Sequence, residues 1–150
     1  MSIDKDIKQR TFKSEHQKAL VNLIYTYNWS TEQLKEIFKR EKLTLQQFNI
    51  LRILRGSETP ISTLEIRERM LDKMSDTSRI VDRLVIKGLV KKVVCKTDKR
   101  LVDVSISDKG RKVLEKLDNC EAEMEGIFGA INQAEAKILN KLLDKIRLSE

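Results

Sequence analysis

Residues 75–110 constrain the fold more than any other part of the chain. SRIVDRL at 78–84 has the apolar spacing of an amphipathic helix, and Gly88 follows it where a helix can end on a left-handed residue. Two runs rich in β-branched residues come next, at 89–95 and 101–106, and the basic turn KTDKR at 96–100 joins them. The sequence therefore predicts a helix followed by a two-stranded ribbon with a charged tip.

Positive charge is concentrated in the same region. Residues 73–112 hold 12 Lys or Arg and 5 Asp or Glu, a net charge of +7, which equals the net charge of the whole chain. Such a basic patch is typical of a nucleic-acid-binding surface, and a solvated basic surface is the alternative interpretation. Together with the helix and ribbon it indicates a winged helix-turn-helix, which places the helix in a DNA major groove and the ribbon tip against the neighbouring backbone or minor groove.

Composition and motifs exclude several other classes of protein. The 150 residues suit one domain, and one proline and five glycines favour long helices. No apolar run approaches the roughly 20 residues of a membrane span, and MSIDKDIKQRTFK lacks the apolar core of a secretory signal, so we expect a cytoplasmic protein without a membrane partner. Two cysteines and one histidine make neither a disulfide framework nor a metal quartet. Without a nucleophile–base–acid set or a phosphate-binding glycine loop, we expect no enzyme and no cofactor.

Apolar periodicity predicts the helices before the ribbon. We expect residues 1–10 to be loosely ordered and a helix to run from about 13 to 41, with a kink or restart at Ser30 or Thr31. Thr44 and Gln47 have the spacing of a capping box that opens the next helix, which ends at Gly56. A short helix is expected at about 60–71, and the helix of the first paragraph is expected to begin between residues 72 and 75.

A second apolar pattern follows the ribbon. Ser107 caps a helix whose apolar positions have heptad spacing for more than two repeats, and Asn132 begins a last helix. The heptad positions are Val113, Leu117, Cys120, Met124, Ile127 and Ile131. The expected fold is mainly α with a small β-wing. A winged helix lobe at about 44–108 is flanked by helices at about 13–42 and 109–148.

Residues 45–117 resemble the MarR family of bacterial transcription regulators. The landmarks are IRERM at 66–70, SRIVDRL at 78–84, KGLV at 87–90, DKR at 98–100, VDVSI at 102–106 and SDKG at 107–110. One departure is Leu71, which stands where family members commonly have a glycine between the two helix-turn-helix helices. The resemblance implies a single MarR-like domain at 1–150, with a DNA-binding lobe at about 44–108 and dimerisation helices at about 13–42 and 109–148. It also implies a homodimer that binds a pseudo-palindromic operator and a repressor that responds to a ligand.

The predicted helix that begins between residues 72 and 75 and ends at Gly88 supplies one set of candidate DNA contacts. Its amino-terminal end, the part usually presented to base edges, carries Ser75, Asp76, Ser78 and Arg79, and Arg83 follows one turn later. Arg79 has the donors to pair with a guanine, and the serine hydroxyls can reach phosphates or bases. Asp76 either accepts from a cytosine or stabilises the helix amino terminus through the dipole. Arg83 either contacts DNA or is held inside the protein by an acidic residue.

The ribbon tip supplies the other set. Lys96 and Lys99, together with Lys91 and Lys92, are candidates for phosphate contacts, although lysines on a ribbon are often only solvated. The MarR resemblance implies that Arg100 enters the minor groove and that Asp98 orients its guanidinium group. The alternative is an ordinary salt bridge within the turn.

The chain has further candidate sites for a small-molecule effector and for redox sensing. The resemblance implies a pocket for a small aromatic or phenolic effector, and Tyr25, Tyr27, Trp29, Phe38 and Phe48 either line such a pocket or pack in the core. A redox role for Cys95 or Cys120 is an alternative to simple packing. The alternative function is a winged-helix protein-interaction module without specific DNA binding, against which the basic wing argues.

Overall fold

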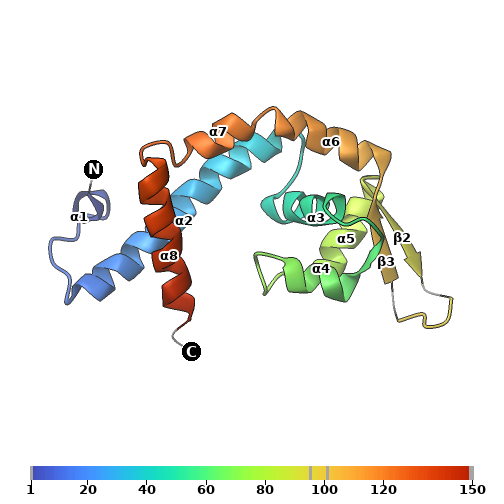
Figure 1. Ribbon diagram of the computed structural model, residues 1–150, viewed down its shortest axis with the longest axis horizontal. Coiled ribbons are helices and arrows are strands. Elements are labelled where there is room, and N and C mark those ends of the chain that lie inside the picture. Colours follow the sequence, from blue (N-terminus) through green and yellow to red (C-terminus); the bar gives the residue numbers. More distant parts are fainter. Residues whose placement is uncertain (1, 95, 101, 149–150) are drawn as a thin grey trace.

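The structure, a computed structural model, describes residues 2–94, 96–100 and 102–148 and is mainly helical. Its elements in chain order are α1 (Ile3–Asp6), α2 (Glu15–Lys39), α3 (Leu45–Arg55), β1 (Ile61–Ser62), α4 (Thr63–Arg69), α5 (Thr77–Ile86), β2 (Val90–Val94), β3 (Val102–Ile106), α6 (Asp108–Asp118), α7 (Glu121–Gly126) and α8 (Gln133–Arg147). The helices α3, α4 and α5 gather with the strands in one lobe, while most of α2 and all of α8 extend away from it (Figure 1). This arrangement confirms the expected fold class.

Local capping signals set where several elements begin and end. The Thr44 hydroxyl accepts from the backbone N of Gln47, and the Gln47 side chain accepts from the backbone N of Thr44, both at 3.1 Å. The Ser107 hydroxyl caps α6 by accepting from the backbone N of Gly110 at 3.0 Å. Gly88 has a φ of 71°, as expected for the left-handed residue after α5. These predicted boundaries are therefore confirmed.

The sheet has three antiparallel strands in the order β1-β3-β2. Val90 pairs with Ile106 in the β2–β3 hairpin, and Ile61 of β1 pairs with Val104 on the other edge of β3. The sequence predicted only the hairpin and assigned Ile61 to the following helix, so that part of the prediction was wrong. A two-residue strand has no period of its own, and its partner lies far along the chain. The predicted strand ends at Cys95 and Leu101 lie outside the described residues.

The hydrophobic core sits where α3 meets α4, α5, the sheet and α6. Its fully buried side chains include Ile50 and Leu51 of α3, Ile66 of α4, Leu84 of α5 and Leu114 of α6. The end of α2 joins the same core, because the ring of Phe38 stacks on that of Phe48 with centroids 4.2 Å apart. The lobe is therefore attached to α2 by an aromatic contact in which Phe38 is buried and Phe48 is half-buried.

Helix α2 runs without a break through Ser30 and Thr31, so the predicted kink or restart was wrong. The Ser30 hydroxyl donates to the carbonyl of Tyr27 at 3.0 Å, and the Thr31 hydroxyl donates to the same carbonyl at 2.9 Å. These side chains bond back to the preceding turn instead of capping a new helix. Near the amino terminus, where the sequence predicts loose order, residues 3–6 form α1: Ile3 is buried and Asp4 pairs with Lys18 at 3.0 Å.

The heptad-spaced apolar positions from Val113 to Ile131, called the seam below, do not lie on one continuous helix. Helix α6 ends at Asp118, Asn119 caps it, and α7 begins at Glu121. Leu117 is buried, and Cys120 and Met124 pack against the core of the lobe. The seam therefore covers the lobe of its own chain, which agrees with packing as the role of Cys120. None of the described helices is both long and apolar enough to span a membrane.

Candidate nucleic-acid interface

The turn between α4 and α5 is built by Asp72 and needs no glycine. Met70 is buried and ends α4 with an extended ψ of 141°, and Leu71 is exposed. The Asp72 carboxylate accepts from the backbone N of Met74 at 3.0 Å, and the Asp72 carbonyl accepts from the Ser75 hydroxyl at 2.8 Å. None of the described residues of this turn has a positive φ, so the turn does not require the left-handed conformation that favours glycine. Leu71 is therefore compatible with a helix-turn-helix.

Helix α5 begins at Thr77, later than the predicted start at 72–75. Asp76 is its N-cap, and the carboxylate accepts from the backbone N of Arg79 at 3.2 Å. This geometry favours the helix-terminus interpretation of Asp76 over a contact with cytosine. Thr77, Val81 and Leu84 face the core. The exposed side of α5 carries Ser78, Arg79 and Arg83, and Ser75 lies half-buried in the turn before it.

The arginines on α5 are available for a ligand. Within the described residues, no side-chain hydrogen bond or ion pair engages the guanidinium group of Arg79 or Arg83. Asp82, the acid next to Arg83, pairs instead with the Lys92 ammonium at 2.7 Å. That pair ties α5 to β2, so Lys92 is less available for phosphate than the sequence suggested. The structure gives no support to the idea that Arg83 is held inside the protein.

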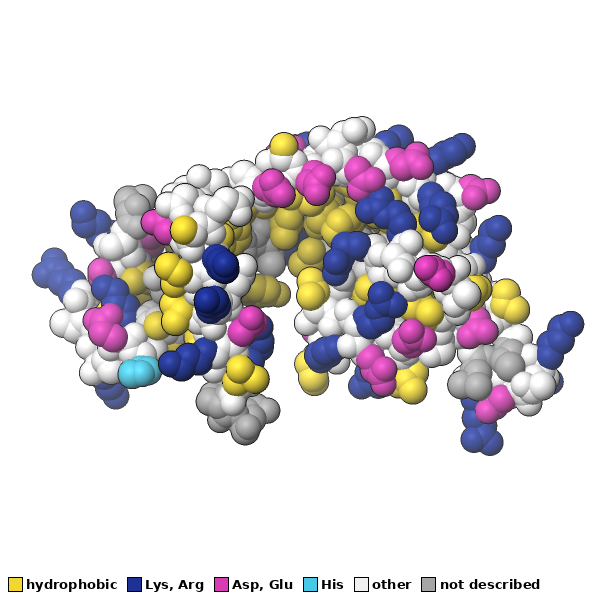
Figure 2. Space-filling view, viewed as in Figure 1, with side chains coloured by type: hydrophobic (Ala, Val, Ile, Leu, Met, Phe, Trp, Pro, Cys, Tyr) yellow, Lys and Arg dark blue, Asp and Glu magenta, His cyan; other side chains and the backbone are white. Residues whose placement is uncertain are grey.

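The wing tip exposes Lys96, Asp98, Lys99 and Arg100. The Asp98 carboxylate accepts from the backbone N of Arg100 at 3.0 Å, which fixes the turn. This contact differs from the expected one, in which Asp98 orients the guanidinium group. Figure 2 shows basic side chains projecting from this end of the molecule, well clear of the lobe. The wing thus presents an exposed cationic tip, and the Asp82–Lys92 pair ties strand β2 of this wing to α5.

A groove of about 440 Å³ lies between the amino-terminal ends of α4 and α5. It is lined by Thr63, Leu64, Arg67, Ser75, Asp76, Thr77 and Ser78. Ser75, Asp76 and Ser78 are among the DNA contacts that the sequence predicts, whereas the groove residues on α4 are not. Thr63 and Arg67 are four residues apart and therefore lie on one face of a helix, which was the available signal.

A larger groove, of about 1120 Å³, separates α2 from the lobe. Tyr27 and Leu34 line it from α2, Leu45 lines it from α3, and Asp72 lines it from the helix-turn-helix turn. Of the five aromatic candidates for an effector pocket, only Tyr27 lines this groove, whereas Phe38 and Phe48 pack against each other. The groove is partly apolar and large enough to hold a small ligand.

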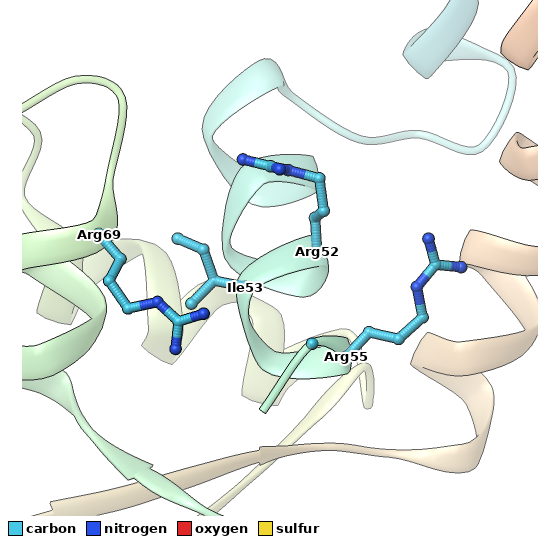
Figure 3. Close-up of a pocket in the computed structure, with 5 residues that line it drawn as sticks. Arg52, Ile53, Arg55 and Arg69 are labelled. Atoms are coloured by element: carbon cyan, nitrogen blue, oxygen red, sulfur yellow. The ribbon is translucent and has the colours of Figure 1, made fainter. Parts of the chain in front are cut away.

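A third cavity, of about 500 Å³, is lined by Arg52, Arg55 and Arg69 (Figure 3). Their guanidinium groups point in different directions. Arg55 forms a bidentate pair with Asp118 of α6 at 2.7 and 3.0 Å, and Arg69 donates to the Ser57 hydroxyl at 3.0 Å. These arginines are therefore engaged within the fold and do not converge on a ligand.

Comparisons with known proteins agree with this geometry. The sequence profile of the MarR family matches residues 42–101. The crystal structure of a MarR transcription factor from Planctomyces limnophilus is similar with a TM-score of 0.68 and 30% identity, covering 93% of this chain and 100% of that one.

Two further solved structures share the fold. MarR from E. coli, as a mutant in complex with operator DNA, has a TM-score of 0.76 and 24% identity, covering 85% of this chain and 93% of that one. BpsR from Bordetella bronchiseptica has a TM-score of 0.75 and 23% identity, covering 83% of this chain and 95% of that one. The DNA binding of BpsR is regulated by 6-hydroxynicotinic acid.

Proposed function

Because this chain belongs to the MarR family of DNA-binding transcription regulators, we propose that it is a cytoplasmic, ligand-responsive repressor that binds a pseudo-palindromic operator as a homodimer. Family membership also decides against a winged-helix module that binds only proteins. MarR transcription regulators are not enzymes, in agreement with the sequence-based expectation. The observation that carries the proposal is the exposed face of α5. Within the described residues, the guanidinium groups of Arg79 and Arg83 have no partner, and the wing that follows α5 ends in an exposed cationic tip.

In the proposed complex, α5 is the recognition helix and lies in the major groove. Arg79 reads a base edge near its amino terminus, and Arg83 follows one turn later. Lys96 and Lys99 contact backbone phosphates, and Arg100 enters the adjacent minor groove, where the negative potential attracts a guanidinium group. Asp98 supports Arg100 through the backbone of the turn, with its carboxylate 3.0 Å from the Arg100 nitrogen.

The homodimer is proposed from the apolar surface of α2 and α8. Helix α8 has no buried residue, and its apolar side chains are left open to solvent: Ile138 is 59% exposed and Leu142 is 53% exposed. Leu20 and Ile24 of α2 are also exposed, and Figure 2 shows hydrophobic side chains in a line along α8. Exposed apolar faces on two helices are costly in water and are typical of a protein interface. A second copy of the chain would cover them, which leaves 44–108 as the DNA-binding lobe.

The effector would bind in the groove between α2 and the lobe. This groove joins the proposed dimerisation helix to the turn that positions the recognition helix, so a ligand there favours one spacing of the two recognition helices over another. Half-sites are expected about 34–36 Å apart. A small aromatic or phenolic anion is the proposed ligand class, and the regulation of BpsR by 6-hydroxynicotinic acid supports an aromatic acid.

DNA titrations at several salt concentrations test the DNA-binding part of the proposal. The wild type should bind operator and random DNA with affinities that fall about a thousandfold or more between roughly 50 and 200 mM salt, as expected for about 6–10 phosphate contacts. Arg79→Ala should weaken operator binding more than random binding, whereas Lys96→Ala and Lys99→Ala should weaken both equally. A flat salt dependence of the wild type would contradict the proposed binding mode.

The effector part needs a separate measurement. A panel of small aromatic carboxylates, with benzoate as the simplest member, should include compounds that lower operator affinity. Leu34→Trp places a large side chain in the groove and should abolish this response while leaving operator affinity unchanged in the absence of ligand. A panel that changes neither the wild type nor the variant would remove the ligand from the proposal.

A further inference from the structure

Arg67 is an arginine whose side chain has no internal role in the fold. It lies near the end of α4, is exposed, and its guanidinium group makes no hydrogen bond or ion pair with any residue that the structure describes. Arg69, two positions later, is also exposed but donates to the Ser57 hydroxyl at 3.0 Å and lines the separate cavity of Figure 3. The two arginines on one short helix therefore serve different surfaces.

The groove beside Arg67 opens at the end of α5 that is proposed to approach DNA. Its lining joins Arg67 and Thr63 of α4 to Ser75, Asp76 and Ser78 at the amino terminus of α5. Thr77, which also lines the groove, has a buried hydroxyl without a hydrogen-bond partner among the described residues. The helix before a recognition helix crosses the DNA backbone, so a cation at this place meets phosphate oxygens before it meets bases.

A phosphate can bind in this groove only if a cation offsets the negative charge of Asp76. The Asp76 carboxylate is committed to capping α5 through the backbone N of Arg79 at 3.2 Å, and its negative charge opposes a phosphate at the same end of the helix. Arg67 is the cationic residue that lines the groove with Asp76. Its guanidinium group can offset the carboxylate and donate two parallel hydrogen bonds to phosphate oxygens.

We propose that Arg67 is a further DNA-contact residue, which binds a backbone phosphate at the groove between α4 and the amino terminus of α5. The inference rests on the proposed function, because α5 must face the duplex for the groove to reach it. The contacts expected from the sequence came only from α5 and the wing, so this site adds a third point of attachment on each protomer.

The test compares Arg67→Ala, Arg67→Lys and Arg69→Ala with the wild type in the same salt titrations. Arg67→Ala should reduce the slope of log affinity against log salt by about 0.9 for each phosphate that is no longer bound, or about two for a dimer. Affinity for operator and for random DNA should fall by the same factor, on the order of tenfold near 150 mM salt. Arg67→Lys keeps the charge and should retain most of the slope. Arg69→Ala is the matched control and should leave the slope unchanged.

The outcomes separate this inference from the proposed function. If the wild type shows no salt-dependent DNA binding, the proposed function itself fails. If the wild type binds as expected but Arg67→Ala and Arg69→Ala leave the same slope, the Arg67 contact is refuted and the rest of the interface stands. A loss confined to operator DNA would also overturn the phosphate assignment, because it would make Arg67 a base contact. Circular dichroism of each variant confirms that the fold is retained.

Discussion

Gly110 offers the sharpest test of the packing between the wing and α6. A Cβ atom added at this position would lie 2.2 Å from the carbonyl oxygen of Leu89 and 2.8 Å from Cγ1 of Ile106. The Leu89 oxygen cannot move aside easily, because it accepts a hydrogen bond from the backbone N of Ser107 at 3.0 Å. Gly110→Ala therefore forces the start of α6 away from the strands that it covers.

The expected magnitude follows from two opposing effects. Replacing glycine by alanine inside a helix ordinarily stabilises it by about 1 kcal/mol. Overpacking of a core costs about 1–3 kcal/mol and can cost more, and a clash with a fixed backbone atom belongs at the upper end. We expect a net loss of about 2 kcal/mol in the free energy of unfolding, or a fall of about 4–8 °C in Tm for a chain of this size.

Urea denaturation followed by circular dichroism measures this loss. Gly126→Ala is the matched control, because a Cβ atom at Gly126 meets nothing within 4 Å among the described residues, and it should be neutral or slightly stabilising. If Gly110→Ala were as stable as Gly126→Ala, the close approach of α6 to the Leu89 carbonyl would be refuted. The glycine of the SDKG motif would then have to be explained by something other than packing.

Three other predictions concern the wing, the dimer and acid stability. Arg100→Ala should weaken operator binding by about 1–3 kcal/mol without changing the urea midpoint, since the side chain is exposed. Leu142→Asp should convert the dimer to a monomer in sedimentation at micromolar concentration; a dimer that persists would contradict the role of α8. The hydrogen bonds from Arg40 lower the pKa of Glu123, so their contribution to stability is present above about pH 4.3 and is lost as the pH falls through the folded-state pKa. Glu123→Gln should therefore narrow the difference between urea midpoints at pH 7 and pH 3, and an unchanged difference would count against this pair.

The sequence by itself determined the features that depend on neighbours along the chain. The capping box of Thr44 and Gln47, the cap at Ser107 and the left-handed Gly88 were all predicted correctly. Each rests on a side chain that bonds to backbone a few residues away, or on the φ of one residue, so no distant contact is needed to decide it. The basic charge of 73–112 is likewise a property of the sequence alone.

Tertiary structure decided everything that depends on a partner far along the chain. Strand β1 exists because Ile61 pairs with Val104. The apolar residues after Ser107 pack against the lobe of their own chain, where Leu117 is part of the core. Lys92 forms an ion pair with Asp82. The Arg67 side chain lines the groove at the amino terminus of α5 and has no partner among the residues that the structure describes. Periodicity reveals that a face is apolar or charged, but only the folded chain determines which surface covers it, because burial and pairing depend on distances that the sequence does not contain.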